Sequence, residues 1–106
     1  MKLINITQTT NFVKNDDIRL EFILLDDNGD IHEELEDFEY LGEIKGELKL
    51  TNDYFTVEDE KLILTIPNSV MGISPGDYDF EIQINTITRR YTVLKDSITI
   101  INELVN

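Results

Sequence analysis

The stretch Ser74–Ile84, SPGDYDFEIQI, decides the fold that this sequence predicts. After the Pro-Gly pair, acidic or polar residues alternate strictly with apolar ones, which is the pattern of a β-strand with one buried face. The residues expected to face inward are Tyr78, Phe80, Ile82 and Ile84, and those expected to face outward are Asp77, Asp79, Glu81 and Gln83. A slip of one residue would bury carboxylates, so the register is strongly specified. We predict a type II turn before the strand, with Gly76 at its positive-φ position.

The same period of two recurs along the chain. The inward positions that it predicts are Ile18, Leu20, Phe22 and Leu24, then Leu62, Leu64 and Ile66, and then Tyr91, Val93, Ile98 and Ile100. Shorter strands are expected over residues 3–7, 37–41, 47–51 and 54–57. Turns are predicted at Asp27–Asp30, with Gly29 at a positive φ, and at Lys95-Asp96. Single helical turns are expected at 32–36 and at 68–71, the second capped by Asn68.

Short strands separated by turns about every ten residues indicate an all-β protein, either an antiparallel β-sandwich or a small, partly open β-barrel. The 106 residues are enough for one domain, which we place at 1–106. Cysteine is absent, which excludes disulfides and thiolate chemistry. Because no apolar run is long enough to span a bilayer, we expect no membrane contact.

The chain carries a formal charge of −13, from 22 acidic and 9 basic residues. Seventeen of the acids lie between Asp16 and Glu60. Such a charge argues against nucleic-acid binding through phosphate neutralisation. It leaves open an acidic protein that mimics DNA and inhibits a nucleic-acid enzyme.

No pattern in the chain predicts catalysis. The acidic segment Asp26–Asp37 suggests a calcium loop, but aligning an EF-hand on Gly29 puts leucines at two ligand positions, so only a weak divalent site remains possible there. His32 is the sole histidine and is expected at the surface, too few for a histidine metal centre. We expect no enzyme activity, no catalytic residue, no metal centre and no cofactor. A carbohydrate-binding sandwich is a further alternative, weakened by the absence of tryptophan.

The outward acids Asp77, Asp79 and Glu81 form a stripe on one face of their strand, and we treat them with Arg89 and Arg90 as a candidate partner-facing surface. Because the two arginines fall on the next strand, we predict that they pair with these acids across the sheet.

The segment Tyr54–Ile100 resembles the small Ig-like β-sandwich of phage tail and baseplate proteins, in particular the N-terminal domain of the upper baseplate protein of phages that infect Gram-positive bacteria. The residues that carry the resemblance are Leu64-Thr65-Ile66-Pro67, the G-x-Y-x-x-x-I pattern of Gly76, Tyr78 and Ile82, the basic pair Arg89-Arg90, the final Ile98 and Ile100, and, upstream, Asp17, Phe22, Leu24, Asp26 and Gly29. It covers about residues 10–102. The chain departs from it in the acidic segment 32–49 and at residues 85–88, where an Asp-Gly turn is usual.

The resemblance implies an Ig-like sandwich that acts as a structural part of a phage or prophage tail tip or baseplate. Its partners would be neighbouring protein subunits, with assembly from copies of itself as one option. The protein would be made in the bacterial cytoplasm and reside in the virion. A stand-alone protein and a fragment of a longer one both fit.

Overall fold

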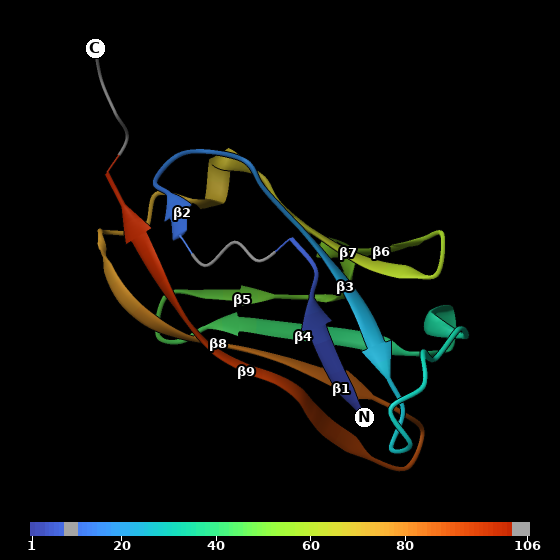
Figure 1. Ribbon diagram of the computed structural model, residues 1–106. Helices are drawn as coiled ribbons and strands as arrows, with labels where there is room; N and C mark the ends of the chain where they lie inside the picture. The colour runs from blue at the N-terminus through green and yellow to red at the C-terminus, as the bar shows by residue number, and fades with distance from the viewer. Residues whose placement is uncertain (8–10, 103–106) are drawn as a thin grey trace.

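A computed structural model describes residues 1–7 and 11–102 and shows an all-β protein (Figure 1). The first sheet contains, in spatial order, β1 (Lys2–Asn5), β3 (Ile18–Leu25), β7 (Lys61–Ile66) and β6 (Phe55–Glu58). The second contains β2 (Asn11–Val13), β9 (Arg90–Ile101), β8 (Gly76–Asn85), β4 (Glu39–Ile44) and β5 (Leu48–Leu50). Three 3-10 turns complete the described elements: η1 (Leu35–Asp37), η2 (Asn52–Tyr54) and η3 (Asn68–Val70).

The two sheets form a β-sandwich, which confirms the predicted fold class. Their strand order is that of immunoglobulin domains, with β1-β3-β7-β6 as strands A, B, E and D, and β9-β8-β4-β5 as strands G, F, C and C′. The long strands β8 and β9 curve strongly, which gives the larger sheet a half-barrel shape (Figure 1). One pair departs from the expected antiparallel arrangement, because the short strand β2, which the alternation pattern did not predict, runs parallel to β9.

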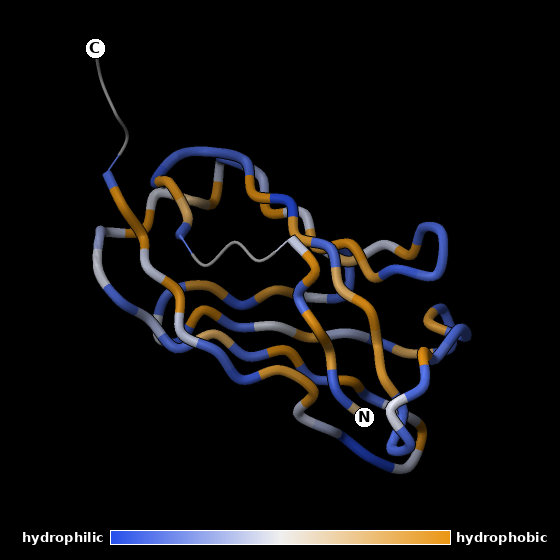
Figure 2. Tube along the Cα trace, viewed as in Figure 1, coloured by the Kyte–Doolittle hydropathy of each residue, from blue (hydrophilic) through white to orange (hydrophobic). Residues whose placement is uncertain are grey.

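The core lies between the sheets and is built by the predicted alternation, as the colours along the chain show (Figure 2). Buried residues in the three best-patterned strands are Ile18, Leu20, Phe22 and Leu24 in β3, Leu62, Leu64 and Ile66 in β7, and Phe80, Ile82 and Ile84 in β8. Gly29 has the expected positive φ, 84°. The framework strands were therefore predicted correctly, including their inward faces.

Tyr78, the third residue of β8 and so near the start of strand F in the immunoglobulin order, is half-buried rather than fully inward. Its hydroxyl donates a hydrogen bond to the Ser74 carbonyl at 2.6 Å. A tyrosine at the start of strand F that bonds back to the backbone a few residues upstream is the tyrosine corner of immunoglobulin-like sandwiches. This bond fixes the approach of the chain to β8 without a disulfide.

The predicted type II turn at Pro75-Gly76 is wrong. Gly76 has a φ of 156°, not the value near +80° that such a turn needs, and it is already the first residue of β8, paired with Ile100. The predicted capping role of Asn68 is also wrong. Pro67 occupies the cap position of η3, and the Asn68 amide donates to Asp17 Oδ1 at 2.7 Å.

The predicted turn at Lys95-Asp96 does not form, because β9 is continuous from Arg90 to Ile101. Ten residues of β8 offer hydrogen-bonding partners along this length, and that ladder outweighs a weak local turn signal. The irregularity lies two residues earlier. Ile82 pairs with Leu94 but Gln83 pairs with Thr92, so Val93 is the extra residue of a β-bulge.

The tyrosine corner generates the first prediction. Replacing Tyr78 by Phe removes only the hydroxyl and its bond to Ser74, and we expect the free energy of unfolding to fall by about 0.5–1.5 kcal/mol. Urea denaturation measures this. Tyr54→Phe is the control, because the Tyr54 hydroxyl has no hydrogen bond to any described residue, and an equal loss in both variants would contradict the role of the corner.

Candidate functional site

The structure places the five predicted surface residues on one hairpin but does not bring them together. Asp77, Asp79 and Glu81 pair across the β8–β9 ladder with Thr99, Ser97 and Lys95, whereas Arg90 pairs with Asn85. The predicted pairing of the arginines with the acids is therefore wrong. In an antiparallel hairpin the residues nearest the turn face each other, so the arginines at the start of β9 meet the end of β8, not its acidic beginning.

Each end of the acidic stripe has a different partner. The Thr99 hydroxyl donates to Asp77 Oδ1 at 2.7 Å. Glu81 forms ion pairs with Lys45 Nζ at 3.0 Å and, more loosely, with Lys95 Nζ at 3.8 Å. Lys45 and Lys95 are the residues that sequence reasoning missed. Only the strand register could have found them, because Lys45 follows β4 and lies far from Glu81 in the sequence.

Lys45 holds two like charges together. Glu43 and Glu81 are direct cross-strand partners on β4 and β8, an arrangement that is unfavourable for two carboxylates. Lys45 Nζ lies 3.4 Å from Glu43 Oε1 and 3.0 Å from Glu81 Oε2. Its bonds to Glu81 and then Glu43 raise the pKa of Lys45. The acids at the centre of this face are thus locally neutralised.

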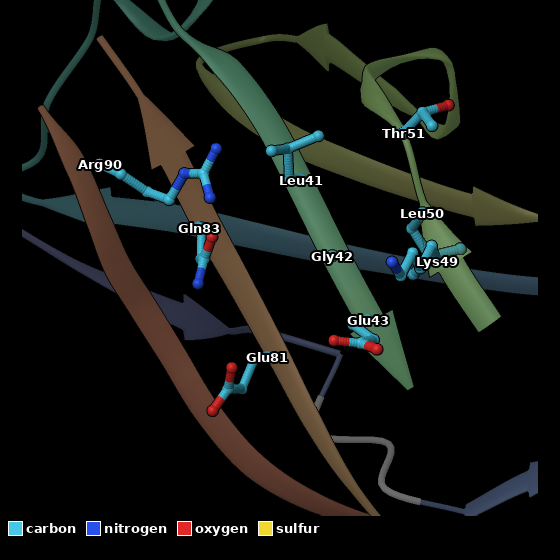
Figure 3. Close-up of a pocket in the computed structure, with 9 residues that line it drawn as sticks. All are labelled: Leu41, Gly42, Glu43, Lys49, Leu50, Thr51, Glu81, Gln83 and Arg90. Carbon is cyan, nitrogen blue, oxygen red and sulfur yellow. The ribbon is translucent and has the colours of Figure 1, made fainter. Parts of the chain in front are cut away.

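Glu43 and Glu81 border a shallow hollow of about 250 Å³ on the outer face of β5, β4 and β8 (Figure 3). Arg90 and Gln83 lie toward one end of it and Glu81 and Glu43 toward the other. An open surface that mixes both charges differs from the enclosed, largely apolar pockets that bind small molecules.

A second hollow, of about 390 Å³, opens beside the edge strand β6. Its lining residues are Glu36, Phe38, Tyr40, Asn52, Phe55, Thr56, Val57 and Leu62. The ring of Tyr40 lies 6.4 Å from that of Phe38 and 5.7 Å from that of Phe55. We call it the aromatic hollow; it has an apolar floor and a carboxylate, Glu36, at an exposed position.

Tyr40 anchors the floor of the aromatic hollow. Its side chain is almost fully buried and its hydroxyl donates to the Leu35 carbonyl at 2.7 Å. Burial raises the pKa of Tyr40, and the nearby charge of Glu36 raises it further. The phenol therefore stays protonated in the folded protein well into the alkaline range.

The acidic segment Asp26–Asp37 does not gather its carboxylates around a point. Asp26 Oδ1 accepts the amides of Asn28 and Asp30 at 2.9 and 3.0 Å, so it closes its own loop. Asp27 accepts from the Met1 amino group at 2.7 Å. No group of three or more metal-binding side chains occurs in residues 1–7 and 11–102. His32, expected at the surface, is half-buried against Phe38, with ring centroids 5.3 Å apart.

The turn between β8 and β9 forms a braced tip, which we define as residues Thr86–Arg90. The Thr86 amide donates to the Arg89 carbonyl at 2.7 Å, and the Arg89 amide donates to the Thr86 hydroxyl at 3.1 Å. The Arg89 guanidinium lies 5.7 Å from the centre of the Tyr91 ring. At the apex, Ile87 is fully exposed (105%). Within the described residues, neither arginine has an ion pair with a carboxylate.

Comparisons with known proteins add information on the fold alone. No protein-family model and no curated protein matches the chain. Among solved structures, the endo-β-1,4-mannanase of Thermotoga petrophila matches with a TM-score of 0.58 and 10% sequence identity, over 96% of this chain and 20% of that one. The matched region is thus about a fifth of the mannanase chain. In the part of the chain that the structure describes, no helix is long and apolar enough to cross a membrane.

Lys45 generates the second prediction. Lys45→Met leaves Glu43 and Glu81 facing each other, so we expect a lower melting temperature at low salt and a smaller loss at high salt, where the repulsion is screened. Adding Glu43→Gln should restore much of the stability. Thermal unfolding at two salt concentrations measures both effects. A loss that is independent of salt would show that the lysine acts through packing instead.

The raised pKa of Tyr40 leads to the third prediction, which concerns stability at alkaline pH. Its raised folded-state pKa means that its contribution to stability is complete below the unfolded-state value near 10 and is lost as the pH rises above it. The wild-type free energy of unfolding should therefore fall by up to about 1.4 kcal/mol per pH unit there on account of this group. Urea denaturation across this range should give a shallower fall for Tyr40→Phe. Parallel curves for the two proteins would contradict it.

Proposed function

We propose that this protein is a non-enzymatic structural module that binds neighbouring protein subunits in the tail tip or baseplate of a phage or prophage. The braced tip carries this proposal. A fully exposed isoleucine followed two and three residues later by arginines, without carboxylate partners in the described chain, is an unusual surface on a protein with a charge of −13. Arginines beside an apolar anchor are typical of the centres of protein interfaces.

The framework supports the same role. Immunoglobulin-like sandwiches present their loops from a rigid scaffold, and here the tip continues directly from the two longest strands. Open edges at β5 and β6 also remain free for strand pairing in the described sheets. The proposed location in a phage tail or baseplate comes from the resemblance of Leu64–Pro67, Gly76 and Tyr78 to phage tail domains.

The alternatives have less support. A DNA mimic needs carboxylates that stand in for phosphates, but Glu43 and Glu81 on the outer face are paired with lysines. A carbohydrate site needs aromatic rings whose faces are open to stack on sugars. Tyr40 and Phe55 in the aromatic hollow are only 2% and 8% exposed.

The fourth prediction tests whether the protein is part of a phage particle. If prophages are induced in cells whose genome encodes this chain and the particles are purified by density gradient, quantitative mass spectrometry should find the protein with the tail proteins at a fixed ratio. The association should survive a high-salt wash, because an assembled part is held by buried contacts as well as by charge. A protein found only in the soluble cell fraction would overturn the proposal.

A further inference from the structure

The braced tip is a hydrogen-bonded turn with an exposed apolar side chain at its apex. Its turn is held by the hydrogen bonds between Thr86 and Arg89, and the Arg89 side chain rests on Tyr91, so little freedom is lost when the tip binds. The Ile87 side chain projects into solvent. In the residues that follow it, the Arg89 guanidinium lies over the Tyr91 ring and Arg90 Nε donates to Asn85 Oδ1 at 3.3 Å. The complement of the tip is an apolar recess rimmed by carboxylates.

The aromatic hollow is such a recess on this same chain. Its apolar lining consists of the half-buried Phe38 and Val57 together with the buried side chains of Tyr40, Phe55 and Leu62. Glu36 is exposed at its lining and has no ion pair in the described residues, and the neighbouring Asp37 and Asp53 are exposed too. An isoleucine could contact the accessible parts of Phe38 and Val57 there, and each arginine would find carboxylates.

The tip and the aromatic hollow lie at the same end of the sandwich. Glu39 at the start of β4 pairs with Asn85 at the end of β8, so the lining residues Glu36 and Phe38 stand close along the chain to the strand that leads into the tip. Figure 1 shows the β8–β9 turn and η1 on the same side of the molecule. A two-fold axis at this end would set each tip against the other copy's hollow, and each contact would be made twice.

We infer that the partner of the tip is a second copy of this chain, in a two-fold dimer where Ile87 of each copy enters the aromatic hollow of the other and Arg89 pairs with Glu36 across the interface. This inference rests on the protein-binding role proposed above and names its partner. The repulsion between two chains of charge −13 opposes the dimer at long range. The local pairing of opposite charges offsets it where salt screens the rest.

The fifth prediction uses the purified chain alone. At about 0.15 M salt, light scattering after size-exclusion chromatography should show a mass that rises with concentration toward twice 12.3 kDa. Ile87→Asp and Arg89→Glu should each weaken dimerisation at least ~10-fold, because each alters the centre of the interface. Both positions are exposed, so the variants should melt at the wild-type temperature.

Two further variants make the test specific. Arg89→Glu combined with Glu36→Arg reverses the proposed ion pair and should restore the dimer, whereas Lys49→Glu makes the same charge change on β5 and should leave it unaffected. A wild-type protein that stays monomeric at every concentration would overturn the inference, and so would a dimer that tolerates Ile87→Asp. If the charge reversal does not restore the dimer, Glu36 is not the residue that pairs with Arg89. None of these results depends on phage particles, so the fourth prediction stands or falls separately.

Discussion

The antiparallel ladder between β8 and β9 is the constraint on which the rest of the structure depends. Ten residues of β8 pair with β9 on one side, and six of them also pair with β4 on the other. The ladder commits Phe80, Ile82 and Ile84 to the core and their neighbours to the surface. It also projects the braced tip and places Glu81 beside both Lys95 and, through β4, Lys45. The core, the outer face and the tip therefore share one register.

Charge on this protein is arranged more finely than its net value suggests. On the outer face, Lys45 lies between Glu43 and Glu81 and offsets their repulsion. On the other sheet, Arg19 of β3 reaches Glu58 of β6 across β7, at 3.6 Å, and the register places this bridge over Ile63. Ile63 points outward yet is only 1% exposed. Lys45 and Arg19 thus each form ion pairs with acids on other strands, and Arg19 also lies over Ile63. The arginines of the tip, in contrast, have no acidic partner in the described chain.

Strand identity and facing were predictable from the sequence because both follow from local alternation. The inward sets of β3, β7 and β8 came directly from period two, and so did the all-β class. What failed depends on pairing between distant segments. The parallel contact of β2, the continuity of β9 through Lys95-Asp96 and the partners of Glu81 are set by which strands lie side by side. The aromatic hollow was not predicted for the same reason, since Phe38, just before β4 of one sheet, and Phe55, in β6 of the other sheet, both line it.

The bulge at Val93 shifts by one residue which side chains of β9 face the core. On its C-terminal side the even-numbered residues Ile98 and Ile100 face the core, whereas on its N-terminal side Tyr91 and Val93 do. In an unbroken ladder the parity of the C-terminal half would continue, and the guanidinium of Arg90 would be directed between the sheets, where burying an unpaired charge is costly. One extra residue therefore lets β9 keep its hydrophobic face and still begin with an exposed Arg90. Inserting or deleting a residue at this point would change the chemistry of the tip without changing a single side chain within it.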